Sequence, residues 1–225
     1  MAAPHPPPGR PAARRTADLV LDASERLVQT RGFNGFSYAD VSAEVGITTA
    51  SLHYHFPSKA ELGRALVERY TATFQAALAA IASREGRAAS QLEGYARLYG
   101  EVLAADRMCL CGMLAAEYET LPGPVQRAIR GFFDANEAWL SHVLERGRAD
   151  GHLSFPGGPR EAARQWTSTL EGAMLLARPY RDVSRLTSVA RRMIDEVTRR
   201  PAGAPAAASA ASARPKRAAA RSRRA

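Results

Sequence analysis

Cysteine and long apolar stretches are scarce in this chain. Its 225 residues include two cysteines, too few for a disulfide scaffold. No segment reaches the roughly 18 uninterrupted apolar residues of a membrane span. The proline-rich start also lacks the apolar segment of an export signal. We therefore expect a cytoplasmic protein that has no membrane partner.

The chain also lacks the alternation of apolar and polar residues that is typical of half-buried strands, and it contains no internal repeat. Apolar residues instead recur every three or four positions almost throughout. With 46% hydrophobic and 24% charged residues, the chain can bury a core. The pattern predicts an all-α fold of nine helices, the first at about Arg14–Thr30.

Acidic side chains are missing from both ends of the chain. The formal net charge is +9, yet residues 16–200 carry 22 basic and 22 acidic side chains, so the whole excess lies in residues 1–15 and 201–225. Residues 1–13 and 201–225 are rich in Pro, Ala and Arg and are predicted to be disordered. Their positive charge suits weak attraction to DNA. The alternative is that both are solvated extensions without a partner.

Residues 14–60 are predicted to form a domain that contains a helix-turn-helix. Its second helix is expected to begin after Ser37, a residue type that caps helices, and to end at Gly46. A third helix, at about Thr49–His55, must end before Pro57. Two short helices joined by a glycine-containing turn are typical of a helix-turn-helix.

The residues from Ile47 to Leu62 resemble the tetracycline-repressor (TetR) family of bacterial regulators. The likeness rests mainly on the run His55-Phe56-Pro57-Ser58-Lys59 followed by Leu62, and it extends back to about Thr16. The resemblance implies a homodimeric repressor that binds a palindromic double-stranded DNA operator through its third helix. It also implies a ligand-binding and dimerisation domain at residues 61–200, where a small-molecule inducer binds and releases the operator. No cofactor and no enzymatic activity are expected.

The third helix and its neighbours supply the predicted DNA contacts. Thr48 is expected to cap the helix, so that its positive dipole end faces the DNA. By analogy with the family, Thr49 and Ser51 hydrogen-bond base edges and Ala50 contacts a thymine methyl group. Lys59 is the main candidate for a phosphate contact. The full predicted set is Ser37, Tyr38, Thr48, Thr49, Ala50, Ser51, His53, Tyr54 and Lys59.

Two histidines of the third helix and the arginines near the N-terminus are further candidates for a functional role. The family more often has tyrosine where this chain has His53, which weakens the prediction at that position. His53 and His55 are two positions apart and point to different sides of a helix, so they cannot share a metal ion. No metal site is predicted. The arginines of the N-terminal arm, Arg10, Arg14 and Arg15, are expected to enter the adjacent minor groove.

The segment from Met108 to Tyr118 contains both cysteines. Cys109, Met113 and Glu117 follow one helical stripe, and a helix start would favour the thiolate of Cys109. The run resembles a branch of the family whose regulators answer to acrylate and other thiol-reactive electrophiles. Covalent modification of Cys109 is therefore an alternative mode of induction. The competing interpretation is that both cysteines are small buried apolar residues.

Aromatic and polar side chains on the C-terminal helices are candidate ligand contacts. The predicted set is Cys109, Met113, Glu117, Tyr95, Tyr99, Trp139, Trp166 and Arg178, with Glu171 and Met174 as further candidates. The last two helices, beginning near Arg160 and Asp182, are expected to pair with their copies in a second chain. A two-fold operator requires such pairing, because its half-sites lie about 34 Å apart.

Two functions from other classes have less support in the sequence. A thiol enzyme is disfavoured because Cys-x-Cys is not the Cys-x-x-Cys redox spacing, and no histidine has an assignable position as partner base. A nonspecific DNA-coating protein would depend on the basic ends of the chain rather than on the helix-turn-helix.

Removing residues 201–225 separates this last alternative from a repressor. A repressor is expected to keep its sequence selectivity and to lose only modest affinity, with a smaller salt dependence because fewer counterions are released. A DNA-coating protein would lose binding altogether. Fluorescence anisotropy with labelled operator and scrambled DNA, at several salt concentrations, measures both quantities.

Overall fold

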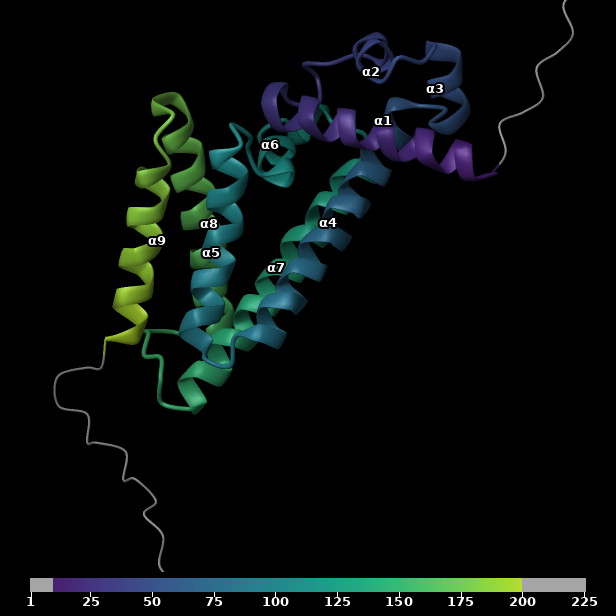
Figure 1. The fold of residues 1–225 in the computed structure, drawn as a ribbon. Helices are drawn as coiled ribbons and strands as arrows, with labels where there is room; N and C mark the ends of the chain where they lie inside the picture. The colour runs from purple at the N-terminus through teal and green to yellow at the C-terminus, as the bar shows by residue number, and fades with distance from the viewer. Residues whose placement is uncertain (1–9, 200–225) are drawn as a thin grey trace, which may run out of the picture.

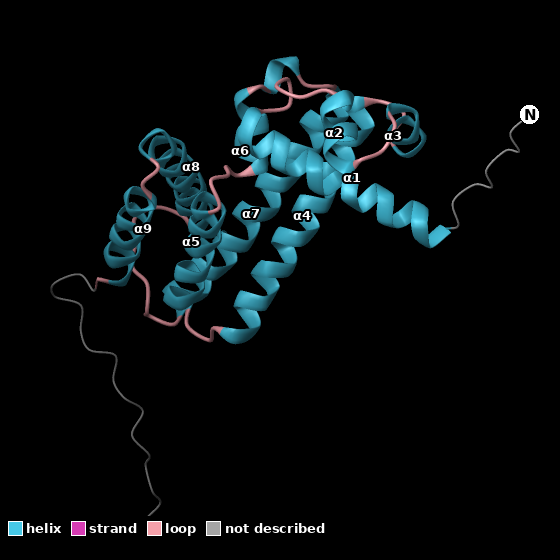
Figure 2. Ribbon diagram, turned by 45° about the horizontal axis from the view of Figure 1, so that its top comes forward, coloured by secondary structure: helices cyan, strands magenta, loops and turns pink. Residues whose placement is uncertain are grey.

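The computed structural model describes residues 10–199, and all regular structure in that range is helical (Figure 2). Nine α-helices and two short 3-10 helices follow one another along the described part of the chain. Their bounds are α1 Arg10–Arg31, α2 Tyr38–Val45, α3 Thr49–His55, α4 Lys59–Arg84, α5 Ala88–Ala104, α6 Leu110–Ala116, η1 Tyr118–Thr120, α7 Gly123–Ala149, α8 Pro159–Ala177, η2 Arg178–Tyr180 and α9 Val183–Thr198.

The all-α prediction with nine helices is confirmed, with one difference at the start. Helix α1 begins at Arg10, four positions before the predicted start, so residues 10–13 continue the helix rather than the arm. Proline is tolerated in a first turn and alanine is the best helix former, which is why Pro11 and two alanines extend the helix. The rest of the predicted disordered segments, residues 1–9 and 201–225, lies outside the described residues.

The helices form two parts that share the long helix α4 (Figure 1). Helices α1, α2 and α3 gather at one end of α4, α7 runs along α4, and α5, α8 and α9 pack together beside α7, while α6 lies next to α1. Helix α4 has 26 residues and is therefore about 39 Å long. It packs along α7 and connects the helix-turn-helix directly with the C-terminal helices.

Polar residues cap the three helices that begin within the N-terminal domain after α1. The side chains of Ser37, Thr48 and Ser58 each accept a hydrogen bond from a backbone N–H in the first turn of the helix that follows. Such a cap typically contributes about 1 kcal/mol to stability. Gly46 ends α2 with φ of 73°, a left-handed conformation that glycine adopts without strain. These local signals explain why the sequence predicted the helix-turn-helix.

Gly63 lies where α4 meets both the N-terminal domain and α7. A Cβ atom at this position would lie 2.7 Å from Phe33 Cε2 and 2.9 Å from Val125 Cγ2. Both neighbours are buried, Val125 completely and Phe33 with 3% exposure. The absence of a side chain therefore lets the loop between α1 and α2 and the start of α7 approach α4 from two sides.

We expect Gly63→Ala to destabilise the protein by about 1–3 kcal/mol, because the extra methyl group overpacks a buried contact. Gly131→Ala is the matched control, since Gly131 is also helical but a Cβ atom added there would meet nothing within 4 Å. The control should stabilise α7 by about 0.5–1 kcal/mol. Urea denaturation measures both. Equal stabilisation by the two substitutions would show that the contact at Gly63 is not tight.

Candidate functional site

Helix α3 presents a polar surface on an apolar anchor. The hydroxyl of Thr48 accepts a hydrogen bond from the backbone N–H of Ser51 at 3.1 Å, as a cap does. Leu52 is completely buried. Tyr54 is 72% exposed, and Thr49 is exposed as well. Ala50 and His53 are also exposed, whereas Ser51 is half-buried. The predicted base-contacting residues therefore lie largely on the solvent side of α3.

Tyr38 and His53 form a contact between α2 and α3. The Tyr38 hydroxyl donates a hydrogen bond to the Phe56 carbonyl at 2.8 Å, and its ring centroid is 4.7 Å from that of His53. Nδ1 of His53 lies 3.2 Å from the carbonyl oxygen of Pro57. Burial raises the pKa of Tyr38 to about 12. Both residues thus hold the end of α3 in place, and their predicted DNA contacts stay predictions.

Ser37 and Asp40 form a capping box at the start of α2. The Asp40 carboxylate accepts hydrogen bonds from the Ser37 backbone N–H at 2.7 Å and from its hydroxyl at 2.6 Å. These bonds lower the pKa of Asp40. The capping box fixes the backbone conformation at Ser37, and the DNA contact predicted for Ser37 stays a prediction.

Lys59 fastens the loop between α1 and α2 to the start of α4. Its ammonium group donates hydrogen bonds to the carbonyl oxygens of Phe33 at 2.6 Å and Phe36 at 2.5 Å. It also lies 4.7 Å and 4.3 Å from the centroids of the same two rings, a cation–π arrangement. Partial burial lowers the pKa of Lys59. The predicted phosphate contact stays a prediction, but two of the three N–H donors already have partners within the protein.

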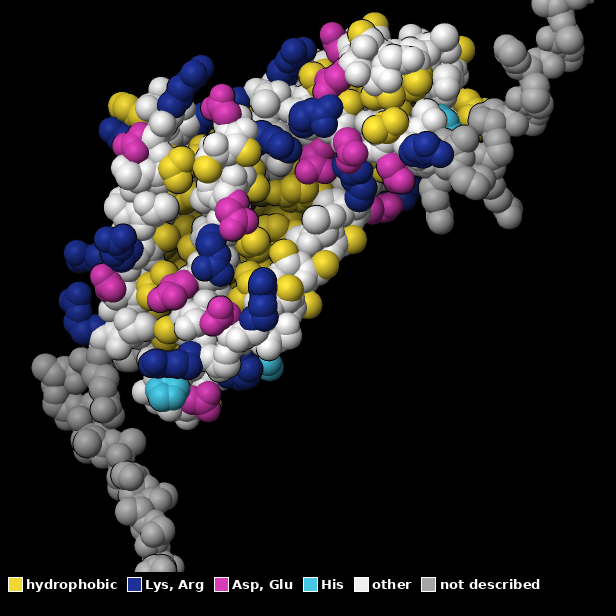
Figure 3. Space-filling view, viewed as in Figure 1, with side chains coloured by type: hydrophobic (Ala, Val, Ile, Leu, Met, Phe, Trp, Pro, Cys, Tyr) yellow, Lys and Arg dark blue, Asp and Glu magenta, His cyan; other side chains and the backbone are white. Residues whose placement is uncertain are grey.

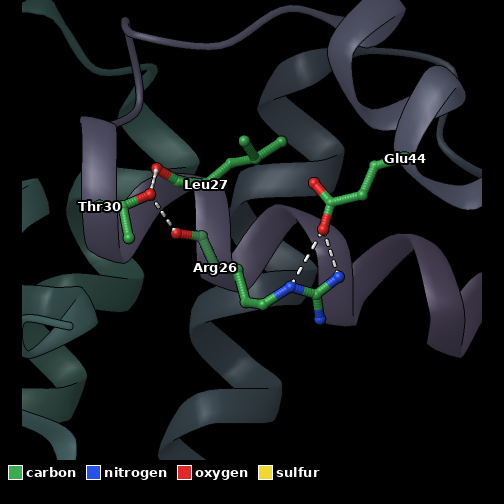
Figure 4. A network of polar contacts seen from close by, with 4 residues as sticks. All are labelled: Arg26, Leu27, Thr30 and Glu44. Atoms are coloured by element: carbon green, nitrogen blue, oxygen red, sulfur yellow. Dashed lines mark hydrogen bonds and ion pairs between the residues drawn. The ribbon is translucent and has the colours of Figure 1, made fainter. Parts of the chain in front are cut away.

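Ion pairs hold α1 against its two neighbours. Arg69 of α4 reaches Asp22 at 2.6 Å and Glu25 at 2.9 Å. Arg26 pairs with Glu44 of α2, and its Nε lies 3.0 Å from the carboxylate (Figure 4). These ion pairs link α1 to both α2 and α4.

The carboxylate of Glu117, one residue after α6, joins the two domains. Its Oε2 accepts hydrogen bonds from the backbone N–H groups of Phe33 at 2.7 Å and Asn34 at 3.2 Å. Gly32, with φ of 83°, precedes them, and a Cβ atom there would collide with the carboxylate. Successive N–H groups at such a turn form a small concave anion site. The carboxylate thus links the end of α6 to the turn after α1, and the ligand contact predicted for Glu117 stays a prediction.

Arg178, directly after α8, makes a second link between the domains. Its guanidinium donates to the carbonyl of Thr30 near the end of α1 at 2.5 Å, and its Nη1 lies 3.3 Å from Sδ of Met113. The backbone N–H of Met108 also donates to the Gln29 carbonyl at 3.2 Å. Met113, Glu117 and Arg178, all predicted as ligand contacts, therefore lie at the domain junction, where α6 packs against α1 (Figure 1).

Among the other predicted ligand contacts, Tyr95 contacts both Tyr99 and Trp139 where α5 faces α7. The hydroxyls of Tyr95 and Tyr99 are 3.2 Å apart, and the Trp139 ring stacks on Tyr95 at a centroid distance of 5.8 Å. Trp166 is buried on α8. Burial raises the pKa of both Tyr95 and Tyr99. The sequence thus correctly placed these residues on facing helices, while a ligand contact by any of them stays a prediction.

Cys109 lies at the start of α6, as predicted, but its burial disfavours the predicted thiolate. Helix α6 begins at Leu110, so Cys109 precedes the helix as its cap, and its side chain is 2% exposed. Burial raises the pKa of the Cys109 thiol well above its usual value, and the nearby Glu171 carboxyl raises it further. Cys111 is completely buried and its pKa is raised for the same reasons. Burial of both thiols therefore outweighs any effect of the helix dipole.

Two polar residues in this core escaped the sequence analysis. Asn136 is completely buried, and neither polar atom of its side chain has a hydrogen-bond partner among the described residues. Thr167 is 4% exposed, and its hydroxyl lies near the phenol of Tyr95. The signal that could have found Asn136 is its position one turn from both Phe132 and Leu140, on the apolar stripe of α7. A polar side chain on such a stripe needs a partner.

The described part of the chain shows no other chemical centre. Within residues 10–199, no three His, Cys, Asp or Glu side chains lie together in a way that could hold a metal ion. No helix in that range is both long and apolar enough to cross a membrane. Of the arm arginines, Arg15 is exposed, and the side chains of Arg10 and Arg14 lie outside the described residues.

We expect Glu117→Gln to lower the free energy of unfolding by about 1–3 kcal/mol, because two N–H groups lose a charged acceptor. Hydrogen exchange at the Phe33 and Asn34 amides should accelerate. Glu119→Gln is the matched control, because Glu119 is an exposed residue two positions away whose carboxylate does not contact these amides. Unchanged exchange at both amides in Glu117→Gln would contradict the interdomain role.

Comparison with known proteins identifies the family. A family model described as bacterial regulatory proteins, tetR family, matches residues 20–66, and one described as a tetracyclin repressor-like C-terminal domain matches residues 89–193. The crystal structure of a TetR-family regulator from Agrobacterium tumefaciens is 35% identical with a TM-score of 0.81, covering 83% of this chain and 100% of that one.

Curated relatives agree with this assignment. The transcriptional regulator AcuR of Cereibacter sphaeroides is 26% identical over 76% of this chain and 80% of its own length. The transcriptional repressor NemR of Escherichia coli is 28% identical over 72% of this chain and 84% of its own. With both domains matched and the fold shared, the chain belongs to the tetR family of bacterial transcriptional regulators.

Proposed function

We propose that this chain is a ligand-responsive transcriptional repressor that binds a palindromic operator as a homodimer. The observation that carries the proposal is the exposed polar surface of α3, capped by Thr48 and anchored by the buried Leu52. Such a helix can enter the major groove with its N-terminal residues at the base edges. Because the function lies in DNA binding, no enzymatic activity is proposed, and the protein acts in the cytoplasm, where the bacterial chromosome is.

A second copy of the chain would cover the exposed apolar end of α8. Leu175 is 57% exposed, Leu176 is 67% exposed and Tyr180 is 63% exposed, and Figure 1 places α8 and α9 at one edge of the molecule. Exposed apolar residues that gather in this way mark an interface. Pairing of α8 and α9 across a two-fold axis would present two α3 helices to two half-sites.

The domain junction supports a route from the ligand to the DNA. Glu117, after α6, binds the turn between α1 and α2, and Arg178, after α8, binds the last turn of α1. A ligand that shifts α6 or α8 would pull on this turn and, through Lys59, on the start of α4. In the ligand-bound state the two α3 helices of the dimer no longer match the spacing of the half-sites. The inducer thereby selects the dimer state that does not bind the operator.

We expect Tyr54→Ala to weaken operator binding about tenfold or more, equivalent to at least about 1.4 kcal/mol, without changing the unfolding midpoint. The reason is that Tyr54 is largely exposed on α3 and contributes to contact rather than to packing. Fluorescence anisotropy with DNA from upstream of the chain's own gene measures the affinity, with scrambled DNA of the same length as control. The wild type should bind as two chains per site. Equal affinity of the wild type for both DNAs would refute the proposed function.

A further inference from the structure

Uncharged side chains dominate the surface that α3 would present to DNA. Residues 16–60 contain three basic and five acidic side chains, and one of the basic ones, Arg26, is paired with Glu44. Figure 3 agrees on the face that it shows, where the surface over α2 and α3 is mostly uncharged. Hydroxyl groups such as those of Thr49 and Tyr54 form hydrogen bonds only at short range and in defined directions. Their contribution to DNA binding therefore depends on where α3 is held.

Lys59 is also basic, but its ammonium group lies against the turn between α1 and α2. It donates hydrogen bonds to the carbonyl oxygens of Phe33 and Phe36, and the rings of the same two residues flank it at centroid distances of 4.7 Å and 4.3 Å. An ammonium group has three N–H donors, so two of them are used within the protein. Hydrogen bonds from a charged donor are among the strongest in proteins. A phosphate that draws the ammonium group outward would break these contacts.

The turn that Lys59 holds leads directly to α2 and α3. Phe36, whose carbonyl oxygen binds Lys59, is followed by Ser37, the cap of α2. Tyr38, the first residue of α2, donates a hydrogen bond to the carbonyl of Phe56 at the end of α3. A continuous series of contacts thus connects the ammonium group on α4 with both ends of the helix-turn-helix. A shift of the turn would move α2 and, through Tyr38, the end of α3.

Opposite charges hold Phe33 from both sides of its backbone. Its N–H group donates to Glu117 at 2.7 Å, and its carbonyl oxygen accepts from Lys59 at 2.6 Å. Burial lowers the pKa of Lys59, and the carboxylates of Glu117 and Asp40 counteract this shift. The cation on α4 and the carboxylate after α6 therefore act on the same residue, at the point where the C-terminal domain meets the turn.

We propose that Lys59 is a positioning residue for operator recognition, which places α2 and α3 through the turn and donates no hydrogen bond to a DNA phosphate. The inference rests on the proposed function and specifies how its DNA-binding surface is held. Removal of the ammonium group then leaves the number of phosphate contacts unchanged, while α3 shifts away from the base edges. Selectivity for the operator is lost, and the salt dependence of binding is kept.

The salt dependence of DNA binding distinguishes positioning from phosphate contact. Lys59→Met removes the charge and keeps an unbranched apolar side chain. By fluorescence anisotropy below the melting temperatures of both proteins, its affinity for DNA from upstream of the chain's own gene should fall about tenfold or more, while its affinity for scrambled DNA stays within about twofold. The slope of log affinity against log salt concentration should not change. A phosphate contact predicts equal losses on both DNAs and a slope smaller by about 0.9, and either result would overturn the proposal.

Two comparisons exclude other reasons for a loss of affinity. Arg64→Met is the matched control, because it removes the same charge from a nearby part of α4, where the guanidinium pairs with Glu68. This control should bind both DNAs as the wild type does, and an equal loss of selectivity in it would assign the effect to overall charge. A purely stabilising role for Lys59 would lower the melting temperature and leave the selectivity of the folded protein intact. Either outcome would overturn the proposal.

Nuclear magnetic resonance on the wild type tests the same point if Lys59→Met does not fold. The chain contains two lysines, Lys59 and Lys216, so isotopic labelling of lysine gives two ammonium signals, which Lys216→Arg assigns. In the complex with the upstream DNA, Nζ of Lys59 should keep its couplings across the hydrogen bonds to the carbonyl carbons of Phe33 and Phe36. Loss of these couplings, or a coupling to phosphorus, would contradict a positioning role.

The proposed function is tested separately from the role of Lys59. A wild type that binds upstream and scrambled DNA equally would reject the repressor itself. A selective wild type, together with a smaller salt slope in Lys59→Met or a coupling of Nζ to phosphorus, would reject the positioning role alone.

Discussion

The contact on which the arrangement of the two domains depends is the carboxylate of Glu117 against the backbone amides of Phe33 and Asn34. A single charged group at the end of α6 thereby fixes the turn that carries α2 and α3. Gly32 permits the approach, because any side chain there would occupy the position of the carboxylate. The ammonium group of Lys59 holds the same turn by donating hydrogen bonds to the carbonyl oxygens of Phe33 and Phe36. Arg178 and the backbone amide of Met108 add two further hydrogen bonds from the C-terminal domain to α1.

The local parts of this structure could be predicted from the sequence, and the long-range parts could not. Ser37, Thr48 and Ser58 cap helices that begin where the pattern predicted, because a cap interacts with residues within its own first turn. Glu117 and its amide partners are more than 80 positions apart, so no periodicity reveals their contact. The sequence placed Cys109, Met113 and Glu117 on one helical stripe, but α6 spans only Leu110–Ala116, so Cys109 precedes the helix and Glu117 follows it.

The ionisation of side chains in the C-terminal core also depends on long-range packing that the sequence does not reveal. Two thiols next to a predicted helix start suggested a reactive cysteine, yet both are buried and have raised pKa values. The burial that keeps the thiols protonated also raises the pKa of Glu171 to about 7. The side-chain amide of Asn136 on α7 lacks a hydrogen-bond partner among the described residues, and asparagine is common on exposed helix surfaces, so only its burial makes it unusual.

A footprint on the DNA upstream of the chain's own gene tests the central claim most directly. The account predicts one protected site with two-fold symmetry and half-sites about 34 Å apart. Protection of both half-sites should be lost when Tyr54 is replaced by alanine. A small molecule that binds the C-terminal core should remove the whole protection at once. Protection spread uniformly along the DNA, or unchanged protection by the Tyr54→Ala variant, would contradict a repressor that reads its operator through α3.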